Sequence, residues 1–140
     1  MHILNSAFYS RDPVEVAREL LGCALVHNHP ERGPLIGRIV ETEAYRGEED
    51  LACHASSGRT PRNAPMYGPP GRAYIYLIYG MYNMFNAVTS PIGQPAAVLV
   101  RAVEPMVGPL DNCDGPGKLT REMGIDRALN HEDLKGARIQ

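Results

Sequence analysis

The sequence predicts an α+β fold: a single domain over residues 1–140, with a curved, mainly antiparallel β-sheet, flanking helices and a protruding β-hairpin. Three observations carry this prediction. Strand-like apolar runs outnumber helical ones, one segment has both start and stop signals of a helix, and a tyrosine-rich run turns tightly at Gly80. A chain of 140 residues can bury its own core without disulfides.

The first clear element is a helix that begins after Asp12. Asp12 is a suitable N-cap, Pro13 fits the first helical position and Glu15 completes a capping box. Gly22 ends the helix at the C′ position. The predicted apolar stripe consists of Val14, Ala17, Leu20 and Leu21.

Two strands and a long loop follow this helix. The strands are expected over residues 23–27 and 35–45, with a turn at 28–34. Residues 46–70 are rich in Gly, Pro and Ser and show neither helical nor strand periodicity. A loop of this length is uncommon in a compact domain and is often functional.

A β-hairpin is expected next, because residues 71–86 hold four of the seven tyrosines around a glycine turn. Alternation places Tyr74 and Tyr76 on one face. Gly80 supplies the positive φ of the turn, which leaves Tyr79 at the tip. An aromatic tip has little core to pack against and calls for a partner, such as a groove or a base step.

The last third of the chain contains one buried strand and a short helix. The strand, over 96–103, is apolar except for Arg101. The helix follows the glycines at 115 and 117. Its start is either a simple turn or a place where backbone amides receive a phosphate, with Lys118 nearby.

Composition limits the function classes. The formal net charge is −2, so any binding of nucleic acid must come from a local patch. No apolar run approaches the roughly 18 residues of a membrane span, and no signal-peptide pattern is seen. We therefore expect no membrane partner, and a cytoplasmic or nucleoid location in a bacterium or a nuclear one in a eukaryote. Cys23, Cys53 and Cys113 are widely spaced and indicate cytosolic thiols rather than disulfides or a zinc site.

Acidic residues are distributed unevenly. Residues 51–103 contain no Asp or Glu, whereas a uniform spread of the 16 acidic residues would place about six there. The same stretch carries four arginines and His54. It is either a nucleic-acid-binding face or largely core, since cores also exclude carboxylates.

Several polar residues are candidates for chemistry. Glu41, Glu43 and Tyr45 fall on one face of the strand at 35–45, where a partly buried carboxylate could act as a general base. Alternatively, both glutamates are solvated or pair with Arg38 and Arg101.

Three further residues need an explanation. Arg101 lies inside an apolar strand and requires a carboxylate or an anionic ligand. Asn86, also in an apolar strand, requires hydrogen-bond partners. His54 is either a site residue or a loop residue with no special role.

Seven segments occur in a fixed order along most of the chain. They are ARELLG at 17–22, GRIVETEAY at 37–45, residues 49–54, RTPRN at 59–63, YIYLIYGMYNMFN at 74–86, RAVEP at 101–105 and DGPGKL at 114–119. As an ordered set they resemble the alkyladenine (3-methyladenine) DNA glycosylase family, also called methylpurine DNA glycosylases.

The resemblance implies a role for each candidate. Glu43 would activate the attacking water, and Arg101 would help to hold that water and the carboxylate. Tyr79 would fill the hole left in the duplex, and Asn86 would disfavour normal guanine. The residues around the flipped base would be Tyr45, His54 and Tyr76. The residues that contact the DNA backbone would be Arg59, Arg62, Met81, Tyr82 and Lys118.

The implied reaction flips alkylated or damaged purines, such as 3-methyladenine, 7-methylguanine or hypoxanthine, from duplex DNA and hydrolyses the N-glycosidic bond. No lysine lies within residues 41–45 or 74–86, so we expect no lyase step. The expected enzyme needs neither a cofactor nor a metal and acts as a monomer on damaged double-stranded DNA.

The resemblance also implies a domain that is shorter than usual in the family after residue 105 and at the C-terminus. Two other functions stay open. One is a DNA-binding module of the same fold without catalysis. The other is a metal-dependent hydrolase with ligands among Glu41, Glu43, Glu48, Glu49, Asp50 and His54.

Overall fold

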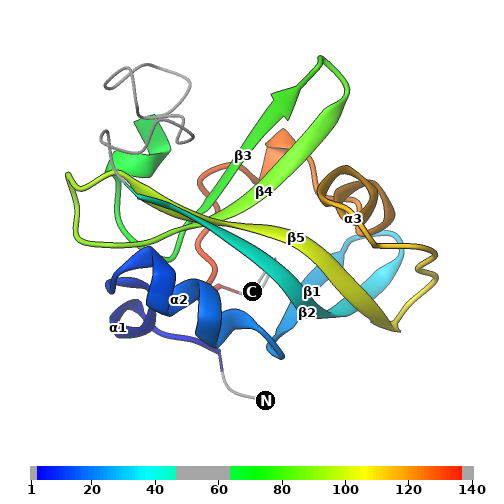
Figure 1. The fold of residues 1–140 in the computed structure, drawn as a ribbon. Coiled ribbons are helices and arrows are strands. Elements are labelled where there is room, and N and C mark those ends of the chain that lie inside the picture. Colours follow the sequence, from blue (N-terminus) through cyan, green and yellow to red (C-terminus); the bar gives the residue numbers. More distant parts are fainter. Residues whose placement is uncertain (1–2, 47–63, 137–140) are drawn as a thin grey trace.

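The computed structural model describes residues 3–46 and 64–136, which form a five-stranded antiparallel sheet in the order β1-β2-β5-β4-β3 (Figure 1). This confirms the predicted α+β class. The strands are β1 (Ala24–His29), β2 (Gly33–Arg46), β3 (Ala73–Ile78), β4 (Tyr82–Val88) and β5 (Ala96–Val107). The helices are α1 (Ser6–Tyr9), α2 (Pro13–Leu20) and α3 (Pro116–Glu122), with short 3-10 helices η1 (Ala64–Tyr67) and η2 (Arg127–Leu129).

Helix α2 begins where its sequence predicts, because the Asp12 side chain accepts a hydrogen bond from the Val14 amide at 3.2 Å. Its buried stripe differs from the prediction. Val14 and Leu21 are 36% and 47% exposed, so their predicted place in the stripe is wrong. The stripe starts at Pro13 and follows the spacing i, i+3, i+4, i+7. Its members are Pro13, Val16, Ala17 and Leu20.

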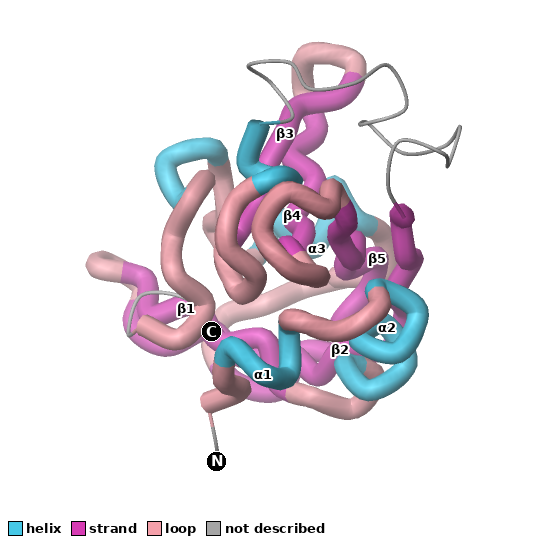
Figure 2. Tube along the Cα trace, turned by 90° about the vertical axis from the view of Figure 1, so that its left-hand side faces the viewer, coloured by secondary structure: helices cyan, strands magenta, loops and turns pink. Residues whose placement is uncertain are grey.

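The sheet separates two apolar clusters. The larger one gathers side chains from α2, α3 and all five strands. The smaller one joins η1 to alternate residues of β3, β4 and β5. Alternation along the strands explains the division, since Ile75 and Phe85 belong to the larger cluster while Tyr74 and Tyr76 belong to the smaller. Both views place α1 and α2 at the end of the molecule opposite the β3–β4 hairpin (Figures 1 and 2).

The β3–β4 hairpin projects beyond the rest of the sheet (Figure 1). Strand β4 pairs with β5 only from Asn86 to Val88, so the outer half of the hairpin is held by its own pairing and by α3. The Thr120 hydroxyl of α3 donates a hydrogen bond to the Asn83 carbonyl at 2.9 Å. The base of the hairpin is therefore held by pairing with β5, whereas its outer half is held by α3.

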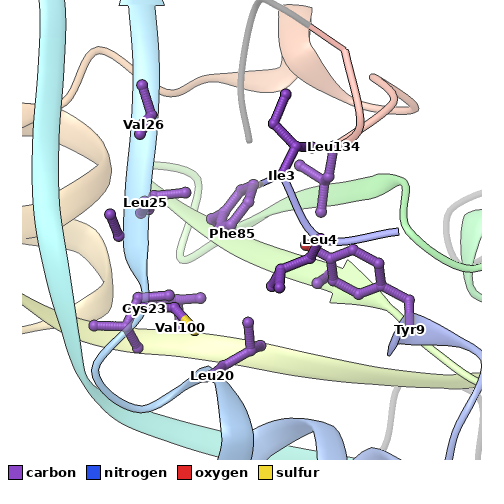
Figure 3. Close-up of a pocket in the computed structure, with 13 residues that line it drawn as sticks. Ile3, Leu4, Tyr9, Leu20, Cys23, Leu25, Val26, Phe85, Val100 and Leu134 are labelled. Carbon is purple, nitrogen blue, oxygen red and sulfur yellow. The ribbon is translucent and has the colours of Figure 1, made fainter. Parts of the chain in front are cut away.

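The larger cluster contains an apolar pocket of about 190 Å³ (Figure 3). Tyr9, Leu25, Phe85 and Leu134 are among the side chains that surround it. Among residues 3–46 and 64–136, no carboxylate, arginine or histidine lines this pocket. It therefore offers mainly apolar packing space, with Tyr9 and Cys23 as its only titratable lining groups among the described residues.

Two sequence expectations concern the surroundings of the protein. None of the helices described is both long and apolar enough to cross a membrane. Cys23, which is partly buried, and Cys113, which is buried, are free thiols, whereas Cys53 lies outside the described residues.

Candidate active site

The register of the sheet places four residues in one row across four strands. Glu43 of β2 pairs with Leu99 of β5, Leu99 with Asn86 of β4, and Asn86 with Tyr74 of β3. Leu99 and Tyr74 belong to the smaller cluster, so the row lies on the face opposite α2. With a strand spacing of about 4.8 Å, Glu43 and Asn86 are separated by roughly 10 Å of sheet.

Glu43 is held by donors from two different strands. Arg101 Nη1 donates to Glu43 Oε2 at 2.7 Å, and the Tyr45 hydroxyl donates to Glu43 Oε1. The Glu43 and Arg101 side chains are 40% and 42% exposed, so solvent and a ligand can reach the carboxylate. The sequence left open whether Glu41 or Glu43 pairs with Arg101, and in the structure it is Glu43.

A strand irregularity brings Arg101 to this position. Glu41 pairs with Ala102 and Thr42 with Val100, so Arg101 falls at a shift in the β2–β5 register and has no Cα partner. Such bulges change the direction of a side chain and are common beside active sites. Glu41 remains exposed and makes no ion pair with any described residue.

Tyr45 is kept in its neutral form by its surroundings. Desolvation raises the pKa of the Tyr45 hydroxyl well above its usual range, and the hydrogen bond to the Glu43 carboxylate adds to this effect. Tyr76 contributes in the same direction and Arg101 in the opposite one. The phenol therefore remains a donor at neutral pH.

The aromatic wall beside Glu43 includes residues that sequence reasoning missed. Tyr76, which was predicted, lies with its ring centroid 5.1 Å from that of Tyr74. Tyr74 is 1% exposed and Met66 of η1 is 2% exposed, and both pack in the smaller cluster, against which Tyr45 also lies. Alternation placed Tyr74 on the same face as Tyr76 from the sequence but gave it no role in the site, and the packing of η1 against β5 joins distant segments and gave no local signal.

Asn86 is buried, as its place in an apolar strand suggested, with 1% of its surface exposed. Its Nδ2 atom donates to the backbone carbonyls of Tyr74 at 3.3 Å and of Met84 at 3.4 Å. These bonds pair the amide nitrogen and fix the orientation of the side chain in the row that contains Glu43.

The hairpin tip carries the most exposed aromatic side chain. Tyr79 is 87% exposed, and Met81 and Tyr82 beside it are 65% and 43% exposed. Positive φ angles at Tyr79 (51°) and Gly80 (66°) form the turn, which Met81 N closes by donating to Ile78 O at 3.1 Å. The expectation of a glycine turn with an aromatic tip is confirmed.

Helix α3 brings Lys118 to the base of this projection. A Cβ atom on the neighbouring Gly117 would lie 2.7 Å from Tyr82 Cδ1, so the start of α3 touches the tyrosine ring directly. Met81 and Tyr82 also line an open groove of about 520 Å³ with residues of α3. Lys118 itself is exposed and is not brought near Glu43 by any contact in the described part of the chain.

Several predicted site residues lie outside the described residues, namely His54, Arg59 and Arg62. Glu48, Glu49 and Asp50 of the metal hypothesis also lie there. Within residues 3–46 and 64–136, no group of three or more His, Cys, Asp or Glu side chains is placed to hold a metal ion.

The stretch without acidic residues, 51–103, contains both buried strands and an exposed hairpin tip. Most of β3, most of β4 and the first half of β5 are buried, so exclusion of carboxylates from the core explains much of it. The tip from Tyr79 to Tyr82 is exposed and cannot be explained in that way.

Comparison with known proteins identifies the family. Residues 7–140 match the family described as methylpurine-DNA glycosylase. The chain belongs to this family. The resemblance predicted from the seven ordered segments is thereby confirmed, and membership makes the chain a DNA glycosylase by family.

Similar proteins from several organisms carry the name "Putative 3-methyladenine DNA glycosylase". A protein of Myxococcus xanthus is 54% identical over 136 residues, which cover 96% of this chain and 70% of the relative. A protein of Legionella pneumophila (strain Lens) is 54% identical over 134 residues, covering 96% of this chain and 73% of the relative. One from Methanocella arvoryzae is 52% identical over 147 residues, with the same two coverages of 96% and 73%.

Proposed function

We propose that this glycosylase excises alkylated or damaged purines from duplex DNA by hydrolysis, with Glu43 as the base that activates water. The observation that carries the proposal is the Glu43 carboxylate, which is part-exposed and held by Arg101 at 2.7 Å on the sheet face that carries the smaller, tyrosine-containing cluster. Family membership supports DNA as the substrate.

The proposed hydrolysis needs one carboxylate, Glu43, and one cation, Arg101. Alkylation at a ring nitrogen makes the purine cationic, so it leaves as a neutral base with the electron pair of the N-glycosidic bond. The developing oxocarbenium ion is stabilised by the nearby Glu43 carboxylate. Water attacks C1′ as Glu43 accepts a proton from it, while Arg101 keeps the carboxylate in place.

Base flipping would bring the purine to this face. An enzyme cannot reach the glycosidic bond while the base is stacked, and unstacking costs a few kcal/mol. Tyr79 at the exposed hairpin tip is a suitable side chain to fill the vacated space. Tyr45 and Tyr76 would stack on the flipped cationic base, with a cation–π contribution of about 0.5–2 kcal/mol.

Two finer features belong to the same proposal. Buried Asn86, held by two backbone carbonyls, would exclude the exocyclic amine of normal guanine. The two lysines of the chain are Lys118, in α3, and Lys135, which pairs with Asp133 at 2.8 Å. Neither is in the row of Glu43, so the proposed enzyme is monofunctional, without a Schiff-base lyase step.

The decisive experiment compares Glu43→Gln with Glu41→Gln. Release of free methylpurine from methylated duplex DNA is measured in EDTA. Glu43→Gln should lower the rate by at least about 100-fold, because it removes the general base. Binding to the damaged duplex should persist. Glu41→Gln, which changes an exposed carboxylate two residues away, should release base at the wild-type rate.

The same assay separates the alternatives. Equal excision by wild type and Glu43→Gln would show that the assigned base is wrong. Loss of wild-type activity in EDTA would instead favour a metal-dependent hydrolase. Binding without base release by the wild type would indicate a DNA-binding module.

A further inference from the structure

We propose that the Tyr45 hydroxyl is a positioning group for Glu43, a role separate from any stacking by the Tyr45 ring. This inference rests on the proposed function, since it assumes that Glu43 is the base. It assigns a role to the hydroxyl oxygen of Tyr45, whereas the proposed function gives a role only to the ring. A phenylalanine would supply the same stacking surface without this contact.

The geometry of the carboxylate supports the role. Tyr45 donates to Oε1 and Arg101 donates to Oε2, so each carboxylate oxygen has its own donor. The last torsion of a glutamate side chain joins sp³ and sp² atoms and has only a broad, two-fold preference. Two donors on different oxygens and from different strands restrict that rotation, which one donor alone would leave free.

The contact also leaves Glu43 able to act on water. A carboxylate has about four lone-pair sites on its two oxygens, and the contacts to Tyr45 and Arg101 use two of them. One site on each oxygen remains for a water molecule. Tyr45 therefore orients the base without blocking it.

The donor persists over the working pH range. Among the described residues, three titratable or charged groups face the Tyr45 hydroxyl: Glu43 on β2, Tyr76 on β3 and Arg101 on β5. Their balance, together with burial, raises the pKa of the phenol. The hydroxyl thus keeps its proton at neutral pH and donates to the ionised carboxylate.

The test is Tyr45→Phe, which keeps the ring and removes the oxygen. A hydrogen bond to a charged group is worth about 1.5–3 kcal/mol, so kcat should fall by about 10- to 100-fold. KM should stay near the wild-type value because the stacking surface is kept.

The matched control is Tyr9→Phe, which removes the hydroxyl of a buried tyrosine in the larger cluster, on the other face of the sheet. It should leave kcat and KM unchanged. Wild-type kcat in Tyr45→Phe would overturn the proposal. A rise in KM with unchanged kcat would overturn it too, because the hydroxyl would then serve base binding.

A second readout separates this proposal from the proposed function. Tyrosinate absorbance is followed during alkaline titration of wild type, Glu43→Gln and Tyr45→Phe, with the last assigning the Tyr45 signal. Glu43→Gln should lower the pKa of Tyr45 by removing the carboxylate that it contacts. If the wild type proves inactive and this shift occurs, the proposed function fails while the contact stands. If no shift occurs, the positioning role is overturned.

Discussion

Tyr9 and Tyr45 show how one residue type is used differently on the two faces of the sheet. Burial in the larger cluster raises the pKa of Tyr9 to about 12, with smaller contributions from Cys23 and Asp133. Tyr45 has a hydrogen-bonding carboxylate beside it, whereas the Tyr9 hydroxyl has no hydrogen-bond partner among the described residues. Tyr9 contributes the apolar packing of its ring, whereas the Tyr45 hydroxyl donates to a carboxylate.

Tyr9 should make folding sensitive to alkaline pH. Its pKa of about 12 in the folded protein lies above the usual value of 10.0. A raised pKa of this kind gives stability that is complete below pH 10 and lost as pH rises through 12. The loss should approach about 2–3 kcal/mol, since one pKa unit corresponds to 1.36 kcal/mol. Tyr9→Phe should flatten this part of the stability curve, measured by urea unfolding at several pH values.

The quantity to compare is the difference between the stability–pH curves of wild type and Tyr9→Phe, because Tyr45 lowers the stability of both proteins at alkaline pH. If wild type and Tyr9→Phe lose the same stability between pH 10 and 12, the assignment to Tyr9 is wrong. Below pH 10 the variant should be at least as stable as wild type, since no partner loses a hydrogen bond.

At the residue scale, the sequence identified Arg101, Asn86 and the two glutamates as polar residues that need partners. It could not decide which glutamate meets Arg101, because a regular strand places Glu41 and Glu43 on the same face. The choice depends on the register shift at Arg101, which arises from the pairing of two segments about 60 residues apart. No local pattern in the sequence predicts that register shift.

At the element scale, the β3–β4 hairpin combines an exposed aromatic with an unfavourable backbone. Tyr79 adopts φ 51°, where a residue other than glycine usually pays about 1–2 kcal/mol. Neither the exposure nor the conformation of Tyr79 helps the isolated fold. Strain of this kind at a projecting tip is consistent with a functional constraint on the side chain.

Tyr79→Asn should therefore stabilise the folded protein and lower its rate of base excision. Asparagine tolerates positive φ, so the free energy of unfolding should rise by up to about 1 kcal/mol. Loss of the aromatic wedge should lower the excision rate on duplex DNA more than on single-stranded DNA. His131→Asn, at another exposed position with φ 73°, should relieve backbone strain without changing excision. An unaffected excision rate on duplex DNA in Tyr79→Asn would rule out the wedge role.

The elements themselves were largely predictable from local signals. The capped helix, the strand at 35–45, the tyrosine hairpin and the strand at 96–103 all occur, with ends that differ by up to four residues. The short helix α1 was missed because four residues are too few to produce a periodic pattern. The stripe of α2 was wrong in part because its orientation is set by the sheet beneath it.

At the scale of the whole molecule, the two faces of the sheet carry different sets of side chains. One face carries the larger cluster with α2 and α3, while the other carries Glu43, Arg101, Tyr45 and Tyr76. The start of α3 contacts Tyr82 at the base of the projecting hairpin. With a formal net charge of −2, the molecule has no overall attraction for DNA, so any electrostatic contribution must come from a few local cations.

This charge balance predicts a weak salt dependence of DNA binding. Each phosphate that a cation neutralises contributes about −0.9 to the slope of log K against log salt concentration. Lys118→Gln should make that slope less negative by about one unit, because Lys118 lies beside the contact between α3 and Tyr82 at the base of the hairpin. Arg18→Gln alters an exposed cation on α2, which lies at the end of the molecule opposite the hairpin (Figure 1), and should leave the slope unchanged. Fluorescence anisotropy with a damaged duplex over a salt series measures both. Equal slopes for wild type and Lys118→Gln would remove Lys118 from the DNA-binding surface, and a change in Arg18→Gln would extend that surface to the face of α2.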